Sequence, residues 1–253
     1  MEELLTQAFW VGLLKIIGVY IILSGDNAVV IALAARSLPA RQQKQAIIWG
    51  AGAAIVLRIV LTLFAVALLS LPWLKLVGSL LLFWIGIKLL IPEDEDPNIK
   101  AHDHLMSAIR TILIADLVMS LDNVIAVAAA AGGSVTLLVL GLAISIPLVI
   151  FGATLLVTLM DRFPVIITIG AGLIGWVAGE MLVADGALKS WLEPLGVVYN
   201  KDGSPYVAGL SLEVISGLIG VAIVVALGMW LAKKKEKETK TAPPAVESGR
   251  SNS

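Results

Sequence analysis

The sequence predicts an all-α polytopic membrane protein with seven transmembrane helices, arranged as a 3+3 inverted repeat plus one C-terminal helix. Three observations indicate this class: the composition, seven long apolar segments, and an Asp-Asn pair that occurs twice. Of 253 residues, 58% are hydrophobic and only 15% are charged, and the mean hydropathy is +0.95. A soluble domain of this size could not bury so much apolar surface, so we expect the lipid bilayer to be its solvent.

The charge balance and the absence of cysteine exclude several classes of function. The formal net charge is −1, which gives no basis for nucleic-acid binding. The chain has no cysteine, so disulfides, thiolate metal sites and cysteine nucleophiles are excluded together. We expect no bound cofactor.

Seven segments are long and apolar enough to cross a bilayer, which takes about 20 residues of helix. They lie at about residues 9–35, 46–70, 72–91, 107–131, 136–160, 164–184 and 211–232. Proline or glycine breakers follow the second, fourth and fifth segments, which predicts antiparallel hairpins. Between and after the spans we expect a cytoplasmic acidic linker at 92–106, an extracytoplasmic loop at 185–210 and a disordered tail at 233–253.

Basic residues beside the spans predict the orientation of the chain. They follow the first, fifth and seventh spans and flank the start of the fourth, which places them all on one side of a seven-span topology. These residues are Arg36, Arg41, Lys44, Lys100, Arg110, Arg162, Lys233, Lys234, Lys235 and Lys237. Because cytoplasmic loops are enriched in Lys and Arg, this side is expected to be cytoplasmic. The sequence thus predicts a multi-pass plasma (inner) membrane protein with its N-terminus outside and its C-terminus in the cytoplasm.

An internal repeat is seen when residues 14–35 are placed on residues 110–131. Ser24-Gly25-Asp26-Asn27 then aligns with Ser120-Leu121-Asp122-Asn123, and an alanine-rich run follows in both copies. Each repeat, at 1–91 and 107–184, holds three spans, so the second copy must enter the membrane from the opposite face. Inverted repeats are typical of transporters, whose site lies at the repeat interface near the bilayer midplane.

Polar residues inside the spans form the candidate site. Asp26 and Asp122 occupy equivalent positions in the two repeats, where an unpaired carboxylate costs roughly 2.5–3.5 kcal/mol on insertion scales. Asp116 adds a third carboxylate, and its spacing places it on one helical stripe with Ser120 and Asn123. Asp122 points about 100° away from this stripe on an unbroken helix.

The chemistry of these groups favours a site for a hard cation. A local unwinding at Ser24-Gly25 would let Asp26 and Asn27 face one site and would free backbone carbonyls as further ligands. Carboxylate and amide oxygens suit divalent ions such as Mn²⁺, Mg²⁺ or Ca²⁺. Alternatively, the polar groups only link helices by hydrogen bonds, each contributing on the order of 0.6 kcal/mol in a bilayer.

Other residues in or near the spans have their own interpretations. Arg58 lies mid-span and needs a partner; it could neutralise an aspartate when no cation is bound, or form a fixed structural ion pair. Glu180 and Asp185 could form an outer mouth for cations or simply lie at the membrane interface. Gly175 and Gly179 belong to a stripe of small residues, which predicts close packing against another helix.

Two motifs resemble the paired signatures of the TerC family. They are Gly25-Asp26-Asn27-Ala28-Val29-Val30 and Ala115-Asp116-Leu117-Val118-Met119-Ser120-Leu121-Asp122-Asn123-Val124. The resemblance covers roughly residues 8–232 and implies a bacterial manganese exporter, grouped with the LysE-type exporters, with Mn²⁺ as the transported ion. Carried over by position, it implies metal ligands at Asp26, Asn27, Asp116, Asp122 and Asn123.

The leading interpretation is therefore a transporter that works by alternating access. A second is a membrane partner protein that supports secretion or metal loading of exported enzymes, with the secretion machinery or a second copy of the chain as its partner. A LysE-like exporter of small solutes is a third. An intramembrane hydrolase that uses Asp26 and Asp122 is disfavoured, because the repeat already explains the pair, so we do not expect an enzyme.

Overall fold

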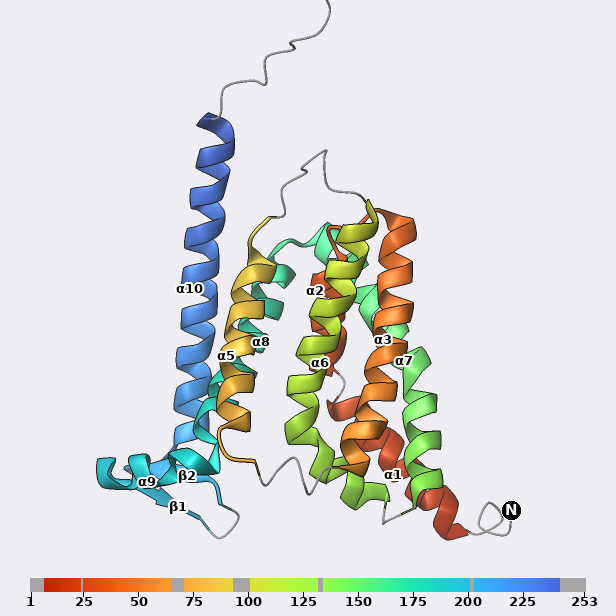
Figure 1. Ribbon diagram of the computed structural model, residues 1–253, viewed down its shortest axis with the longest axis vertical. Helices are drawn as coiled ribbons and strands as arrows, with labels where there is room; N and C mark the ends of the chain where they lie inside the picture. The colour runs from red at the N-terminus through yellow and green to blue at the C-terminus, as the bar shows by residue number, and fades with distance from the viewer. Residues whose placement is uncertain are drawn as a thin grey trace, which may run out of the picture.

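The computed structural model describes residues 7–23, 25–64, 71–92, 101–131, 134–200 and 203–241. This part of the chain is mostly helical, as the sequence predicts. The main helices in Figure 1 are α1 (Gln7–Leu23), α2 (Gly25–Ala35), α3 (Ala40–Leu63), α5 (Leu74–Leu90), α6 (Ala101–Ala131), α7 (Val135–Arg162), α8 (Val165–Val183) and α10 (Leu212–Thr241).

Five helices of the described part are long and apolar enough to cross a bilayer. They are Ala40–Leu63, Asp103–Leu121 within α6, Val135–Arg162, Val165–Val183 and Leu212–Glu238 within α10. Helices α1 and α5 have 17 residues each, which reach about 25 Å at 1.5 Å per residue, somewhat less than the roughly 30 Å hydrocarbon core. The count of seven spans therefore stays a prediction.

Large apolar side chains cover the outside of the bundle. Trp49 on α3 is 67% exposed and Phe151 on α7 is 69% exposed. Most of the apolar surface of α7 and α10 likewise faces away from the rest of the chain. A water-soluble protein rarely leaves such a surface uncovered, so lipid is the environment that fits it.

The predicted first span is two helices rather than one. Helix α1 ends at Leu23 and α2 begins at Gly25, and the two run in different directions in Figure 1. The break lies at the Ser24-Gly25 step where unwinding was predicted, although residue 24 itself is outside the described residues. Glycine favours such a break because it has a low helix propensity. Helix α6 is continuous through the equivalent step, where Leu121 stands in place of glycine.

Helix α2 lies at the centre of the packing although it has only 11 residues. All of its residues from Asn27 to Ala35 are buried, and it contacts α3, α6, α7 and α8. Its Leu33 belongs to the main core together with Ile112 of α6 and Ile174 of α8. A short helix that is buried from its third residue onward brings Asn27 into the interior of the bundle, directly after the partly buried Asp26.

The helices pair across the two predicted repeats. Helix α3 packs on α6, α1 and α2 pack on α7, and α5 packs on α8. A twofold axis that exchanges α2 with α6, α3 with α7 and α5 with α8 would produce this set of pairs. The pairing agrees with the predicted inverted repeat, which itself stays a prediction.

Helix α10 packs against α8 with almost no space between the two backbones. A Cβ atom added to Gly175 would lie 2.6 Å from the carbonyl oxygen of Gly220, and one added to Gly179 would lie 2.1 Å from that of Ser216. The small-residue stripe on α8 is therefore a packing surface, as predicted, and its partner is α10.

The segment predicted as a loop at 185–210 contains regular structure, so the prediction of an all-α fold is wrong in this detail. Three short helices, η2 (Gly186–Leu188), α9 (Lys189–Leu192) and η3 (Glu193–Leu195), precede a three-stranded antiparallel sheet. Its strands are β1 (Val197–Tyr199), β2 (Pro205–Val207) and β3 (Leu210–Ser211), with Val198 opposite Tyr206 and Tyr206 opposite Ser211. Val-Val-Tyr favours a strand, and Gly203 (φ 86°) and Gly209 (φ 82°) supply the turns.

The predicted disordered tail is also partly wrong, because α10 continues to Thr241. Lys234 and Glu238, one helical turn apart, lie 3.9 Å from each other, and such pairs support an exposed helix. Residues 242–253 lie outside the described part, as do residues 93–100 of the predicted acidic linker. Residues 101–106 of that linker form the start of α6.

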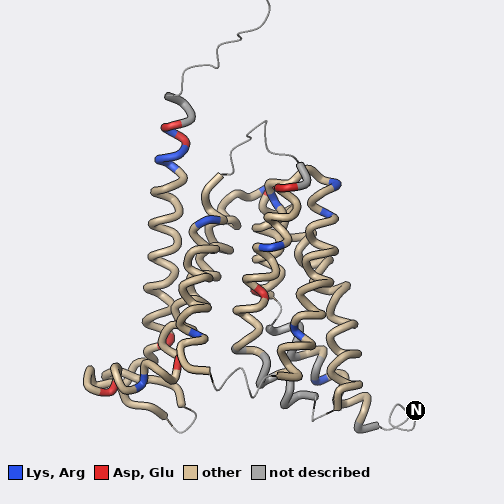
Figure 2. The backbone as a smooth tube through the Cα atoms, viewed as in Figure 1, with Lys and Arg blue, Asp and Glu red and all other residues tan. Residues whose placement is uncertain are grey.

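The described basic residues that predict the orientation gather at one end of the bundle. They lie at the end of α2, α7 and α10 and at the start of α3 and α6, the upper end in Figure 2. Arg36 donates a hydrogen bond to the carbonyl oxygen of Leu89 (2.9 Å) and Lys235 donates one to that of Pro92 (2.7 Å), which ties the end of α5 to its neighbours. That this basic end faces the cytoplasm is a proposal.

Candidate functional site

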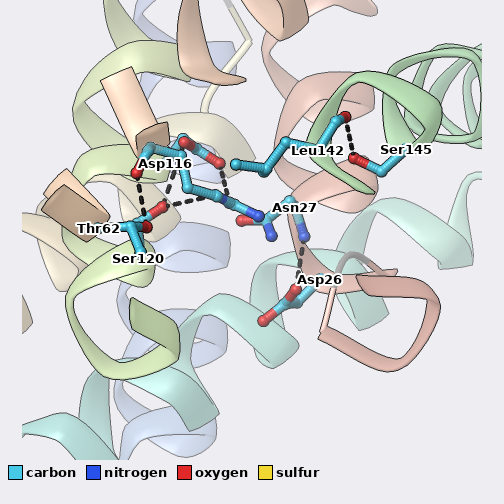
Figure 3. A network of polar contacts seen from close by, with 8 residues as sticks. Asp26, Asn27, Thr62, Asp116, Ser120, Leu142 and Ser145 are labelled. Atoms are coloured by element: carbon cyan, nitrogen blue, oxygen red, sulfur yellow. Dashed lines mark hydrogen bonds and ion pairs between the residues drawn. The ribbon is translucent and has the colours of Figure 1, made fainter. Parts of the chain in front are cut away.

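The buried ion pair of Arg58 and Asp116 is the centre of the candidate site. The side chains of the two residues are 6% and 7% exposed. The Arg58 Nη2 group donates to Asp116 Oδ1, and Arg58 Nε donates to Ser120 Oγ at 3.0 Å. The Ser120 hydroxyl in turn donates to Asp116 Oδ2 at 3.3 Å, so the three side chains form one connected network (Figure 3).

The depth of this network follows from the position of Asp116 in α6. Asp116 stands fifteen residues from each end of the helix, which is about 22 Å along its axis in either direction. A carboxylate at the middle of such a long apolar helix lies far from both ends, and burial without a partner would be unfavourable. Arg58, near the end of α3, supplies that partner from a different helix.

A small cavity lies beside the ion pair. Its volume is about 10 Å³, which is at the lower limit for a single water molecule. Four polar residues on four helices line it: Asn27 (α2), Arg58 (α3), Asp116 (α6) and Ser145 (α7). The rest of the lining is apolar and consists of Ile31, Ala51, Ala54, Ile55 and Val149. The structure thus has a narrow site with no room for a hydrated cation.

The structure brings two of the predicted ligands to one cavity. Asn27, 4% exposed, and Asp116, 6% exposed, both line it. Asp26 is the neighbour of Asn27 in the first turn of α2, and its Oδ1 accepts a hydrogen bond from the Asn27 backbone N–H at 2.8 Å (Figure 3). A carboxylate in this position is stabilised by the helix dipole and satisfies one of the free N–H groups. Asp26 does not line the cavity.

The other two predicted ligands lie further along α6. Asn123 is partly buried and does not line the cavity. The backbone of Asp122 belongs to α6, whereas its side chain is outside the described part. Among the described residues, no group of three or more His, Asp or Glu side chains could hold a metal ion. The assignment of all five residues as metal ligands therefore stays a prediction.

The structure contains one contact within the stripe of polar residues that is predicted on the fourth span. Ser120 lies one turn after Asp116 on α6 and donates to its carboxylate, as the spacing of four residues suggests. Arg58 pairs with one of the aspartates, which both interpretations of this arginine require. Its main-chain carbonyl also accepts a hydrogen bond from Thr62 Oγ1 at 2.8 Å.

Asp185 has a structural role that the sequence did not reveal. Its carboxylate, buried in a residue that is 5% exposed, accepts hydrogen bonds from the backbone N–H groups of Ala187 (2.8 Å), Leu76 (3.0 Å) and Trp73 (3.4 Å). It thereby caps η2 and the start of α5 together. An Asp before a short helix is a known capping signal, but nothing in the sequence indicates the contact with α5. This geometry favours a structural role for Asp185 over the outer mouth for cations, one of its two interpretations.

The chain is similar to three membrane proteins of Bacillus subtilis (strain 168). It is 45% identical over 190 residues to the uncharacterized membrane protein YjbE, a match that covers 75% of this chain and 87% of YjbE. It is 28% identical to YceF over 174 residues, covering 63% of this chain and 66% of YceF, and 28% identical to YkoY over 200 residues, covering 70% and 61%. The chain spans slightly less than two thirds of the length of the last two. No solved structure matches.

A family model confirms the resemblance that the two Asp-Asn motifs carry. The model of the family described as "Integral membrane protein TerC family" matches residues 5–238. This range includes every described helix that packs around the ion pair and all five predicted ligand positions. The chain belongs to the integral membrane protein TerC family.

Proposed function

We propose that this chain is a membrane transporter that exports divalent metal cations, Mn²⁺ foremost, from the cytoplasm through the cavity between α2, α3, α6 and α7. One observation carries the proposal: a carboxylate, Asp116, stands midway along a long apolar helix and faces a cavity lined by polar groups from four helices. Charged groups inside transmembrane segments are rare and mark the paths of ions or substrates.

The donor atoms support a hard cation as the cargo. The cavity offers a carboxylate, an amide and a hydroxyl, contributed by Asp116, Asn27 and Ser145. Oxygen donors of this kind suit Mn²⁺, Mg²⁺ or Ca²⁺ and are poor partners for Cu⁺. Hydrogen bonding alone would hold the helices together with uncharged groups, without a buried carboxylate and guanidinium.

Alternating access is the mode of transport that this arrangement favours. The cavity has a volume of only about 10 Å³, so a hydrated ion can enter only after the helices around it separate. The break between α1 and α2 provides a place for movement directly before Asp26 and Asn27. Discontinuous helices whose ends meet at mid-membrane are common in secondary transporters. With the basic end of the bundle in the cytoplasm, export runs from that end to the side of the small sheet.

The test is Mn²⁺ flux in liposomes that contain only the full-length chain. Liposomes with the wild-type protein should pass Mn²⁺ faster than protein-free liposomes, and Asp116→Asn should reduce this flux to background. Asp161→Asn is the matched control, because Asp161 is exposed at the end of α7 and outside the cavity. It should leave the flux unchanged.

The outcome separates the proposal from the other interpretations. No flux above background from correctly folded wild-type protein would refute transport and favour the role of a membrane partner protein. Flux of a cationic amino acid without flux of Mn²⁺ would favour a small-solute exporter instead. In cells that lack their own manganese efflux, the wild-type chain should lower the intracellular manganese content and Asp116→Asn should not.

A further inference from the structure

We propose that Arg58 is a tethered competitor for the transported cation: its guanidinium occupies the Asp116 site when the site is empty and must leave before a metal ion can bind. The inference rests on the proposed function and concerns how the same site is regulated. Its physical basis is that both oxygens of the Asp116 carboxylate are already engaged, one of them by a permanent positive charge.

Two hydrogen-bond donors occupy the carboxylate oxygens of Asp116 that a cation would need. Arg58 Nη2 donates to Asp116 Oδ1, and Ser120 Oγ donates to Asp116 Oδ2. Arg58 Nε holds the guanidinium in place through a further bond of 3.0 Å to Ser120 Oγ. A metal ion needs direct bonds to carboxylate oxygens, so at least one of these two donors must give way.

The size of the cavity excludes the addition of a hydrated cation beside the guanidinium. With a volume of about 10 Å³ it has space for one water molecule at most. The guanidinium itself needs more room than this, so it can leave Asp116 only when the helices around the cavity separate toward Ile55, Ala54 and Ala51 of α3, which line it. Side chains on a helix lean toward its N-terminus, so this part of the wall lies in the direction in which the Arg58 side chain extends.

The exchange has two consequences for transport. First, the empty site holds a paired carboxylate, so the protein can return to its starting state without an unneutralised charge at mid-membrane. Second, a solute must carry positive charge to replace the guanidinium at Asp116, which discriminates against neutral and anionic solutes. Arg58 is therefore a specificity-determining residue as well as a partner for Asp116.

If Arg58 and Asp116 form only a fixed structural ion pair, the loss of Arg58 should have the opposite effect on Mn²⁺ binding. If Arg58 only holds α3 to α6, its loss should weaken the fold and leave metal binding unchanged or weaker. If Arg58 competes with the cargo, its loss should strengthen metal binding and slow the release of the ion. The sign of the change in Mn²⁺ affinity therefore distinguishes the two roles.

The experiment measures Mn²⁺ binding and Mn²⁺ flux for the full-length chain in lipid. Free Mn²⁺ is followed by its solution EPR signal during titration of the protein in lipid nanodiscs, and flux is measured in liposomes. Arg58→Met should bind Mn²⁺ at least about tenfold more tightly than wild type and transport it more slowly, as expected when a competing state is removed. Lys88→Met removes a cation outside the cavity, one that lies over the Trp84 ring, and should change neither quantity.

A second variant keeps both charges in case Arg58→Met does not fold. Ser120→Ala removes one anchor of the guanidinium and frees Asp116 Oδ2. The loss of such a hydrogen bond should tighten Mn²⁺ binding roughly two- to tenfold. Size-exclusion chromatography and thermal unfolding show which variants are folded.

The possible results distinguish a failure of the proposed function from a failure of the competitor role alone. Wild-type protein that neither binds nor transports Mn²⁺ refutes the proposed function. Wild-type protein that transports Mn²⁺, together with a folded Arg58→Met or Ser120→Ala variant that binds Mn²⁺ no more tightly, refutes the competitor role alone. Tighter binding that disappears in Arg58→Met/Asp116→Asn supports the competitor role, because it shows that the gain passes through the Asp116 carboxylate.

Discussion

The contact between α8 and α10 makes a prediction that can be worked out from the distances. Replacing Gly179 by alanine adds a Cβ atom 2.1 Å from the Ser216 carbonyl oxygen and 2.9 Å from the Gly217 Cα atom. Both are backbone atoms, so no change of side-chain rotamer relieves the clash. Real Cβ contacts are essentially never shorter than 3.0 Å, so the two helices must separate locally by about 0.9 Å or more.

The free energy of this change follows from two opposing effects. Forcing extra atoms into a packed interior costs about 1–3 kcal/mol, and the separation also loosens the contact between Gly175 and Gly220. Alanine regains up to about 1 kcal/mol through its higher helix propensity. We expect a net destabilisation of about 1–2 kcal/mol. For a chain of this size it lowers the unfolding midpoint by roughly 2–8 °C.

The control is a glycine-to-alanine substitution at another position of α8. An added Cβ at Gly172 would have its nearest neighbour, Val221 Cγ1, at an ordinary 3.4 Å. Gly172→Ala should therefore be neutral or slightly stabilising. Thermal unfolding of both variants in one detergent can be followed by tryptophan fluorescence, since the chain has seven tryptophans. Equal midpoints for the two variants would show that α8 and α10 are not in the close contact described here.

Three further predictions concern buried polar groups. Asp116→Asn should destabilise the fold by about 3–5 kcal/mol because it leaves the Arg58 charge buried without its carboxylate. Adding Arg58→Met should recover part of this loss of stability. Additive effects of the two substitutions in a double-mutant cycle would contradict the pairing. Asp185→Ala should lower the free energy of unfolding by about 1–3 kcal/mol through the loss of two helix caps and should leave Mn²⁺ flux unchanged. A flux that depends differently on cation concentration in this variant would instead support Asp185 as part of an outer mouth for cations. Ser79→Ala removes a buried 2.7 Å hydrogen bond to the Ala178 carbonyl and should cost only about 0.6 kcal/mol, the average in bilayers; a loss several times larger in the same unfolding assay would contradict this estimate.

Much of the fold could be predicted from the sequence because the bilayer imposes simple rules. Apolar segments of about 20 residues are expected to be helices, since a helix satisfies its backbone hydrogen bonds within one segment in lipid. The basic residues that predict the orientation gather at one end of the bundle, and the α8 stripe packs closely against a neighbour. Arg58 could be recognised as a residue that needs a carboxylate, and the Asp116–Ser120 contact follows from helical spacing.

The features that sequence reasoning missed depend on contacts between distant residues. Asp185 reaches backbone groups 109 and 112 positions earlier in the chain, and no local pattern indicates such a partner. The sheet at 197–211 is built from strands of two or three residues, too short to show a clear period. Likewise, the motif places Asp26 and Asn27 together, but only the packing of α2 shows that Asn27 lines the cavity and Asp26 does not.

The separation of Arg58 and Asp116 in the chain has a consequence for biosynthesis. The arginine is made 58 residues before the aspartate that neutralises it, a delay of about 3–12 s at typical rates of translation. During that interval the Arg58 guanidinium enters the membrane on α3 without its carboxylate partner, because α6 has not yet been synthesised. The guanidinium must extend toward a membrane surface or be shielded by the insertion machinery. The contact between Arg58 of α3 and Asp116 of α6 can form only after α6 has been synthesised, so the rate of translation sets the earliest time at which these two helices can pair.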